Sequence, residues 1–219
     1  MTVDQKTAFL AFIRNGGGFV GIHSATDTFY DWPEYGALIG GYFDNHPWRE
    51  EVSVRVEDQT HPATKHLAER FQINDEIYQF KQWSRDRVNV LMSLDTQSVD
   101  TTRDSVHRSD NDFALTWSHS YGDGRVFYTA LGHEDAVWKD DRFQRLIVNG
   151  IVWAIGDDRN TSPVRWESLL GEQVEDTWRG YQHESMPDGW KMVNGELSRV
   201  NDAGAVSYTH LTLPTNREV

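Results

Sequence analysis

Apolar residues recur along the first two thirds of the chain with spacings that predict helices and strands in alternation. Residues 2–15 carry them three and four positions apart, which is typical of an amphipathic helix that ends at Gly16. The apolar run at 19–22 predicts a short strand covered on both faces. Residues 143–154 repeat the helical spacing and predict a helix that ends at Gly156. The buried side of the first helix is expected to carry Ala8, Phe9, Phe12 and Ile13.

Shorter patterns in the middle of the chain predict strands. Valines alternate with polar residues over 52–56, which is the period of a strand with one solvated face. Residues 88–94 form a continuous, mostly apolar run and predict a buried strand. The segments 113–118 and 125–131 flank a turn at 121–124 that contains Asp-Gly, so we expect a β-hairpin there.

Three further segments connect these elements. Pro33 and the glycine pair at 40–41 predict the start and the end of a short helix. Residues 42–48 mix aromatic and polar side chains and predict a loop. Residues 95–112 are mostly polar and predict a long surface loop.

The pattern changes after residue 156. Residues 157–165 are polar and predict a linker. Residues 166–206 contain tryptophans among glycines and short alternating runs, which predicts the opening strands of a separate β domain. The tail at 207–219 fits neither part. Its Ser-Tyr-Thr-His-Leu stretch is the translation of a common library-preparation adapter, so we interpret this segment as adapter-derived and not as part of the fold.

Composition narrows the class of protein. With 38% hydrophobic residues among 219, the chain can bury a core and is expected to be globular. The formal charge of −13 argues against a nucleic-acid partner, because phosphate binding needs a basic face. No apolar run approaches the ~20 residues of a membrane span. The chain has no Cys, which excludes thiolate ligands and cysteine nucleophiles, while an exported and a cytoplasmic location both stay open.

Two histidines follow the ends of predicted strands. His23 comes directly after the run at 19–22 and is followed by Ser24 and Asp27, whereas His133 follows the second strand of the hairpin. Because ligands of open α/β sheets bind beyond the carboxyl ends of the strands, both imidazoles are well placed for chemistry. An imidazole that only bonds to backbone at a strand end is the structural alternative for each.

The acidic pair Asp75-Glu76 lies between apolar neighbours, so at least one carboxylate can face a pocket, and we favour Glu76. His23, Glu76 and His133 together suit a Zn-like divalent ion, because two imidazoles and one carboxylate leave open positions on the metal. No local metal-binding signature accompanies them, and the same three residues can instead act as catalytic acid and base. The candidates for substrate binding are Ser24, Asp27, His46, Trp48 and Tyr78.

An ordered set of motifs resembles the ThuA-like trehalose-utilisation family over residues 2–156. The motifs are GGGFVGIHS at 16–24, GGYF at 40–43, HP at 46–47, HPAT at 61–64, DEIY at 75–78, GDGRVFY at 122–128 and LGH at 131–133. The resemblance implies a flavodoxin-like α/β fold of the class I glutamine amidotransferase type, with a parallel sheet and helices on both faces. It also implies that the domain at 1–156 lacks its first strands, so we expect an exposed sheet edge and poor solubility.

The likeness to the amidotransferases bears on the chemistry. Their nucleophilic Cys follows Gly-Ile, and Gly21 and Ile22 precede His23 at what resembles the same turn. Their catalytic His resembles His133. Because the chain has no Cys, an amidotransferase that works through a thioester is excluded, and the resemblance implies a similar pocket with different chemistry.

Residues 166–206 resemble the start of the 3-keto-disaccharide hydrolase domain, which is a β sandwich. The motifs are WRGY at 178–181, PDGWK at 187–191 and GEL at 195–197. This resemblance implies a downstream hydrolase domain in the full-length bacterial protein and a sugar or keto-sugar as the substrate.

The two resemblances imply an enzyme domain of disaccharide catabolism that hydrolyses, eliminates or isomerises a 3-keto-glycoside. A ketone at C3 acidifies the proton on C2, so Glu76 or His23 can remove it while a metal or His133 stabilises the enolate. One alternative is a non-catalytic carbohydrate-binding module attached to a 3-keto-glycoside hydrolase. The other is a purely structural relic of the fold.

Overall fold

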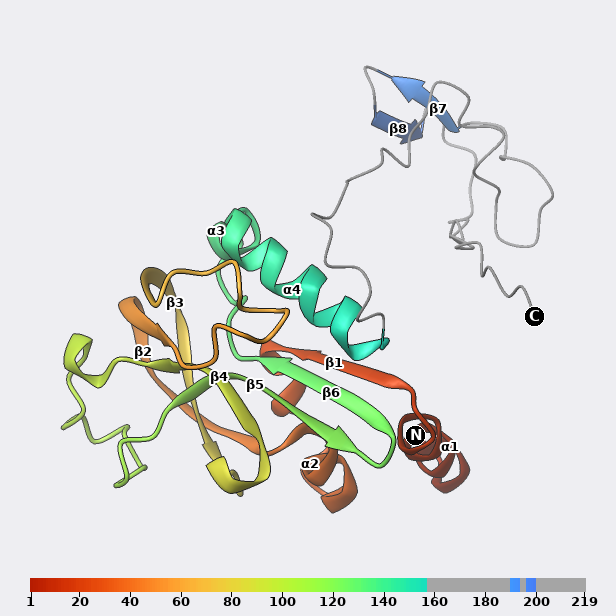
Figure 1. Cartoon of the computed structure of the whole chain (residues 1–219), viewed down its shortest axis with the longest axis horizontal. Coiled ribbons are helices and arrows are strands. Elements are labelled where there is room, and N and C mark those ends of the chain that lie inside the picture. The colour runs from red at the N-terminus through yellow and green to blue at the C-terminus, as the bar shows by residue number, and fades with distance from the viewer. Residues whose placement is uncertain (157–189, 194–195, 200–219) are drawn as a thin grey trace. The chain divides into compact units, whose positions relative to one another are not determined.

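A computed structural model describes residues 1–156, 190–193 and 196–199 of the chain. The chain divides into two compact units, Met1–Thr161 and Ser162–Val219 (Figure 1). In the second unit, β7 (Trp190–Val193) and β8 (Glu196–Arg199) form an antiparallel pair. The predicted linker at 157–165, the rest of the predicted β domain and the predicted adapter-derived tail lie outside the described residues.

The first unit is built on one six-stranded sheet in the order β1-β6-β5-β4-β2-β3. Its strands are β1 (Gly18–Ile22), β2 (Tyr42–Val56), β3 (Arg70–Lys81), β4 (Asn89–Leu94), β5 (Ala114–Tyr121) and β6 (Gly124–Thr129). The α/β class is confirmed, but the sheet is mixed, with β1 and β6 parallel and every other pair antiparallel. The short turn between β5 and β6 makes an antiparallel pair, because a parallel connection needs a crossover of a dozen or more residues.

Helices cover both faces of this sheet, as expected (Figure 1). α1 (Val3–Arg14) and α2 (Pro33–Ile39) pack on one face, while the short α3 (Asp135–Trp138) and α4 (Asp141–Ala154) pack on the other. Along β6, Val126 and Tyr128 join the core under α1 and α2, whereas Phe127 joins the core under α4. Within the described part of the chain, none of the helices has the length and apolarity needed to cross a bilayer.

The first helix begins as the sequence predicts. Thr2 and Gln5 form the capping box, with each side chain accepting a hydrogen bond from the other residue's backbone N–H. The predicted buried face is wrong in part, since Ala8 is exposed and Phe12 is 65% exposed, while Leu10 and Ile13 enter the core. The helix therefore rests on a narrower strip than its apolar residues suggest.

The predicted loop at 42–48 is wrong, because these residues begin the long strand β2. β2 pairs with β3 in antiparallel register, and its register shifts between Phe43 and Asn45 and again between Asn45 and Trp48. These bulges break the two-residue alternation that marks a strand in a sequence, and Pro47 is tolerated at such an irregularity.

The segment at 95–112 contains only the short η3 (Thr96–Ser98) as regular structure, as a loop prediction requires. Gln79 on β3 is fully buried and ties this loop to the sheet. Its Nε2 donates to the Ser105 carbonyl at 2.9 Å and to Asp44 Oδ2 at 3.2 Å, and its Oε1 accepts from the backbone N–H of His107 at 3.0 Å. The loop is thus anchored beside the β2-β3 pair.

Candidate active site

His23 lies at the turn where β1 ends and η1 (His23–Thr26) begins. Its φ of 45° lies in the left-handed region, which is uncommon for a residue other than glycine. Tyr128 donates its hydroxyl to the His23 carbonyl at 2.7 Å and helps to hold this turn. The His23 Nδ1 is 2.6 Å from the carbonyl oxygen of Ala130. Because a carbonyl can only accept, Nδ1 carries the proton, and the lone pair of Nε2 faces the site.

His133 is placed by a turn that a buried carboxylate holds together. Asp75 is fully buried and accepts three backbone N–H groups, from Gly132 at 2.7 Å, His133 at 3.0 Å and Glu134 at 3.1 Å. Gly132 has a φ of +115°, which a side chain would strain. In the sequence Asp75 stands out only as one of two adjacent carboxylates that can face a pocket, and no local pattern indicates this positioning role.

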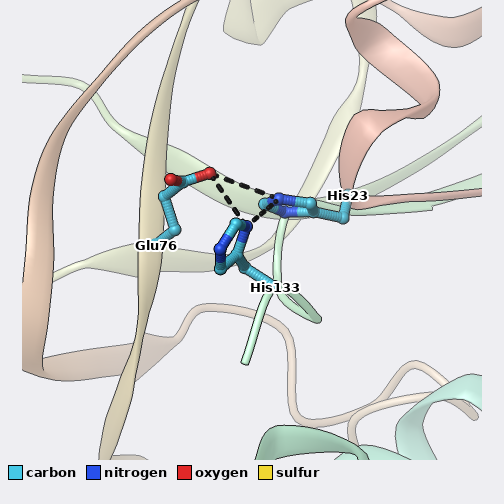
Figure 2. A group of neighbouring side chains, drawn as sticks. All are labelled: His23, Glu76 and His133. Carbon is cyan, nitrogen blue, oxygen red and sulfur yellow. Dashed lines mark hydrogen bonds and ion pairs between the residues drawn. The ribbon is translucent and has the colours of Figure 1, made fainter. Parts of the chain in front are cut away.

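Glu76 completes the group from the middle of β3, where it is 7% exposed. Its Oε2 is 3.4 Å from His23 Nε2 and 3.2 Å from His133 Nδ1. The two imidazole nitrogens are themselves 3.2 Å apart. Figure 2 shows the three side chains pointing toward one another from separate segments of the chain. Three residues that lie 53 and 57 positions apart in sequence therefore present one donor atom each to a common point.

These distances fit a tetrahedral metal site. Zinc ligands at about 2.0–2.1 Å from the ion lie about 3.3–3.4 Å from one another at tetrahedral angles. The three observed separations of 3.2, 3.2 and 3.4 Å thus match one face of a tetrahedron and leave a fourth position for water or substrate. In metal sites an imidazole ligand is oriented by a hydrogen bond from its other ring nitrogen, and the bond from His23 Nδ1 to Ala130 is of this kind. The same distances also allow a protonated His133 Nδ1 to donate to Glu76.

Tyr78 borders this group on β3. Its hydroxyl is 2.8 Å from His23 Nε2, and the two rings lie 4.3 Å apart between centroids. Burial, followed by the charges of nearby carboxylates including Glu76, raises the pKa of Tyr78 well above its ordinary value. The phenol therefore keeps its proton and acts as a donor toward the site.

His46 lies on the outer side of Glu76. Its Nδ1 is 3.7 Å from Glu76 Oε1, and half of its side chain is exposed. Its ring stacks on that of Phe43 with 6.0 Å between centroids. The imidazole thus links the buried carboxylate to solvent.

The remaining predicted substrate contacts have different surroundings. Ser24 is exposed in η1, directly after His23, and Asp27 accepts the hydroxyl of Tyr30 at the surface. Trp48 has no exposed surface, packs edge-on against Phe113 and donates Nε1 to the Asp100 carbonyl. The prediction that Trp48 contacts substrate is wrong, because the side chain belongs to the core.

Comparisons with known proteins agree with this fold. A solved structure of a ThuA-like protein from Bacteroides uniformis ATCC 8492 is 31% identical, with a TM-score of 0.61, over 72% of this chain and 66% of that one. A ThuA-like protein from Parabacteroides merdae ATCC 43184 is 23% identical, with a TM-score of 0.54, over 71% and 66% of the two chains. The chain thus spans slightly less than two thirds of each of these proteins. A comparison with curated proteins found no match.

The likeness supports the α/β fold of the flavodoxin and glutamine amidotransferase type. A family model described as ThuA, trehalose utilisation, matches residues 1–154, which is most of the chain and all of the sheet that carries the site. The chain therefore belongs to the ThuA family of trehalose utilisation.

Proposed function

We propose that the first unit is an enzyme domain that holds a divalent, Zn-like ion on His23, Glu76 and His133 and acts on a 3-keto-glycoside. The observation that carries the proposal is the convergence of three donor atoms at 3.2 to 3.4 Å from one another, with a fourth position left open. The description of the family as trehalose utilisation supports a carbohydrate as the substrate.

The neighbours of the three ligands have distinct roles in this proposal. A bound divalent ion would supply Lewis acidity toward a carbonyl oxygen at the open position. Tyr78 donates to the lone pair of His23 Nε2 in the described arrangement. When that lone pair is engaged by a metal, the hydroxyl is free to donate to a substrate oxygen on which negative charge develops.

Proton transfer is assigned to the outer side of Glu76. In a 3-keto-glycoside the proton on C2 is acidic, and we assign its removal to His46 together with the Glu76 oxygen that faces it. The electrons of the C2–H bond form a C1–C2 double bond as the C1–O bond breaks, and the leaving oxygen takes up a proton. Addition of water across the double bond then completes net hydrolysis.

The alternative of a non-catalytic sugar-binding module requires aromatic and hydrogen-bonding groups but no coupled acid-base set. In the described structure Tyr78, His23, Glu76 and His133 are linked by contacts of 2.8 to 3.4 Å. Groups coupled at this distance, with one of them a buried carboxylate, favour catalysis over passive binding.

The test is release of p-nitrophenol from p-nitrophenyl 3-keto-β-glucoside by the 219-residue chain, with and without EDTA. We expect EDTA to abolish release and Zn²⁺ to restore it. His23→Ala should lower kcat/KM at least 100-fold, whereas the matched control His66→Gln, a histidine outside the group, should not. In D₂O, deuterium should enter at C2 of the recovered substrate if the C2 proton is removed. No turnover by a folded, metal-supplied sample would contradict the proposal and favour the binding module.

A further inference from the structure

Trp138 differs from the other described tryptophans in its exposure. It lies at the end of α3 and is 46% exposed, whereas Trp153 is partly buried and Trp32, Trp48, Trp83 and Trp117 are buried. Phe12, Phe29 and Tyr30 are similarly exposed rings, but Trp138 is the exposed ring that lies next to the turn carrying His133. The exposed indole lies next to the turn that carries His133, so it can contact a ligand bound there.

The indole is fixed beside the turn that carries His133. Its Nε1 donates to the carbonyl oxygen of Gly132 at 2.9 Å, and Gly132 directly precedes His133. Its ring packs edge-on against Phe143, with 5.1 Å between centroids. A Cβ built on Gly132 would lie 3.5 Å from the indole Cζ2, so the ring is in ordinary contact with this turn.

This anchoring decides what the side chain can offer a ligand. The polar N–H is already used within the protein, so the exposed part of the indole is apolar ring surface. Because the ring is held at both its nitrogen and its edge, binding a ligand costs little further loss of side-chain freedom. Beside the turn, Arg49 Nε and Glu134 Oε1 form a surface ion pair of 2.7 Å, which supplies polar partners for hydroxyl groups.

We propose that Trp138 is the platform on which a pyranose ring of the substrate stacks. This inference rests on the proposed function and adds the class of sugar to it. A glucose-configured pyranose carries its hydroxyls at the rim and C–H groups on its faces. The C–H face suits the electron-rich face of the indole, and the rim hydroxyls suit the Arg49–Glu134 pair.

The test is a titration of the chain, labelled with ¹⁵N-tryptophan, with methyl α-D-glucopyranoside, which lacks the ketone and does not react. The Trp138 indole signal is the one missing from a spectrum of Trp138→Phe. We expect that signal to shift saturably, and Trp138→Ala to raise the dissociation constant at least tenfold. Phe12→Ala, which removes an exposed ring on α1, should change it less than twofold, and Zn²⁺ binding should be the same in all variants.

The outcomes separate the two proposals. If the wild-type chain binds the glucoside while the Trp138 signal does not move, the platform is overturned and the proposed function stands. An unchanged dissociation constant in a folded Trp138→Ala has the same meaning. If the wild-type chain binds neither this glucoside nor a 3-keto-glucoside, the proposed function falls and the platform with it. The wild-type titration tests the inference even where Trp138→Ala fails to fold.

Discussion

His23 donates its Nδ1 proton to the carbonyl oxygen of Ala130, 2.6 Å away, and this bond decides which nitrogen faces the site. With Nδ1 occupied, Nε2 is the donor atom that meets Glu76 and His133. The carbonyl oxygen of Ala130, which follows β6, thus determines which ring nitrogen of His23, which follows β1, keeps a lone pair toward the site.

The first prediction concerns this tautomer. In ¹⁵N-histidine spectra at pH 8, His23 should be protonated on Nδ1, and Zn²⁺ should shift the signal of its Nε2. His61 provides an internal reference of the opposite kind, because its Nδ1 accepts the backbone N–H of Ala63 at 3.2 Å and its proton is on Nε2. A His23 protonated on Nε2 would contradict the proposed coordination.

The second prediction concerns Asp75. Its carboxylate accepts three backbone N–H groups of the 132–134 turn, and a hydrogen bond to a charged group contributes about 1.5–3 kcal/mol. Asp75→Asn places an amide against these donors and should lower the free energy of unfolding by about 3 kcal/mol, measured by urea denaturation. It should also weaken Zn²⁺ binding, because His133 loses its position. The control Glu51→Gln, an exposed carboxylate on β2, should do neither.

The third prediction concerns pH. His61 is 8% exposed, and its Nε2 is among the described buried atoms that lack a hydrogen-bond partner. Burial lowers its pKa from 6.5 to about 4. The unfolded chain therefore binds a proton below pH 6.5 that the folded chain does not, so stability falls as the pH drops from 6.5 toward 4.

This one group should cost about 2 kcal/mol of unfolding free energy between pH 7 and pH 5. Burial also lowers the pKa values of His66 and His119, which act in the same direction. Urea titrations at the two pH values should therefore show a smaller difference for His61→Gln than for the wild-type chain. Equal differences in the two proteins would assign the acid sensitivity to other groups.

The sequence predicted the positions of His23 and His133 because both follow strand ends, which local apolar patterns mark well. It also grouped Glu76 with them as one candidate site, but no local pattern places Glu76 there, since its approach depends on β3 pairing with β2 so that Glu76 lies opposite Arg49. The role of Asp75 in holding the 132–134 turn could not be predicted for a related reason. Its three partners are backbone groups some 57 to 59 positions away, and a sequence carries no local signal for such bonds.

The different surroundings of Trp48 and Trp138 could not be predicted from the sequence either. The sequence does not show that Trp48 is buried in the core while Trp138 is 46% exposed, because burial depends on how the chain folds. The bulges in β2 hid the strand that buries Trp48, and α3 is a four-residue helix, which is too short to show helical periodicity. Local sequence patterns therefore predict the turns that carry His23 and His133 more reliably than the side chains around them.

Equilibrium dialysis with Zn²⁺ followed by elemental analysis measures directly whether His23, Glu76 and His133 bind one divalent ion. We expect one tightly held Zn²⁺ per wild-type chain, with His23→Ala and Glu76→Gln each weakening binding at least 100-fold while His66→Gln retains it. A folded wild-type chain that binds no Zn²⁺, Mn²⁺ or Co²⁺, or that binds an ion unaffected by these substitutions, would contradict the proposed site.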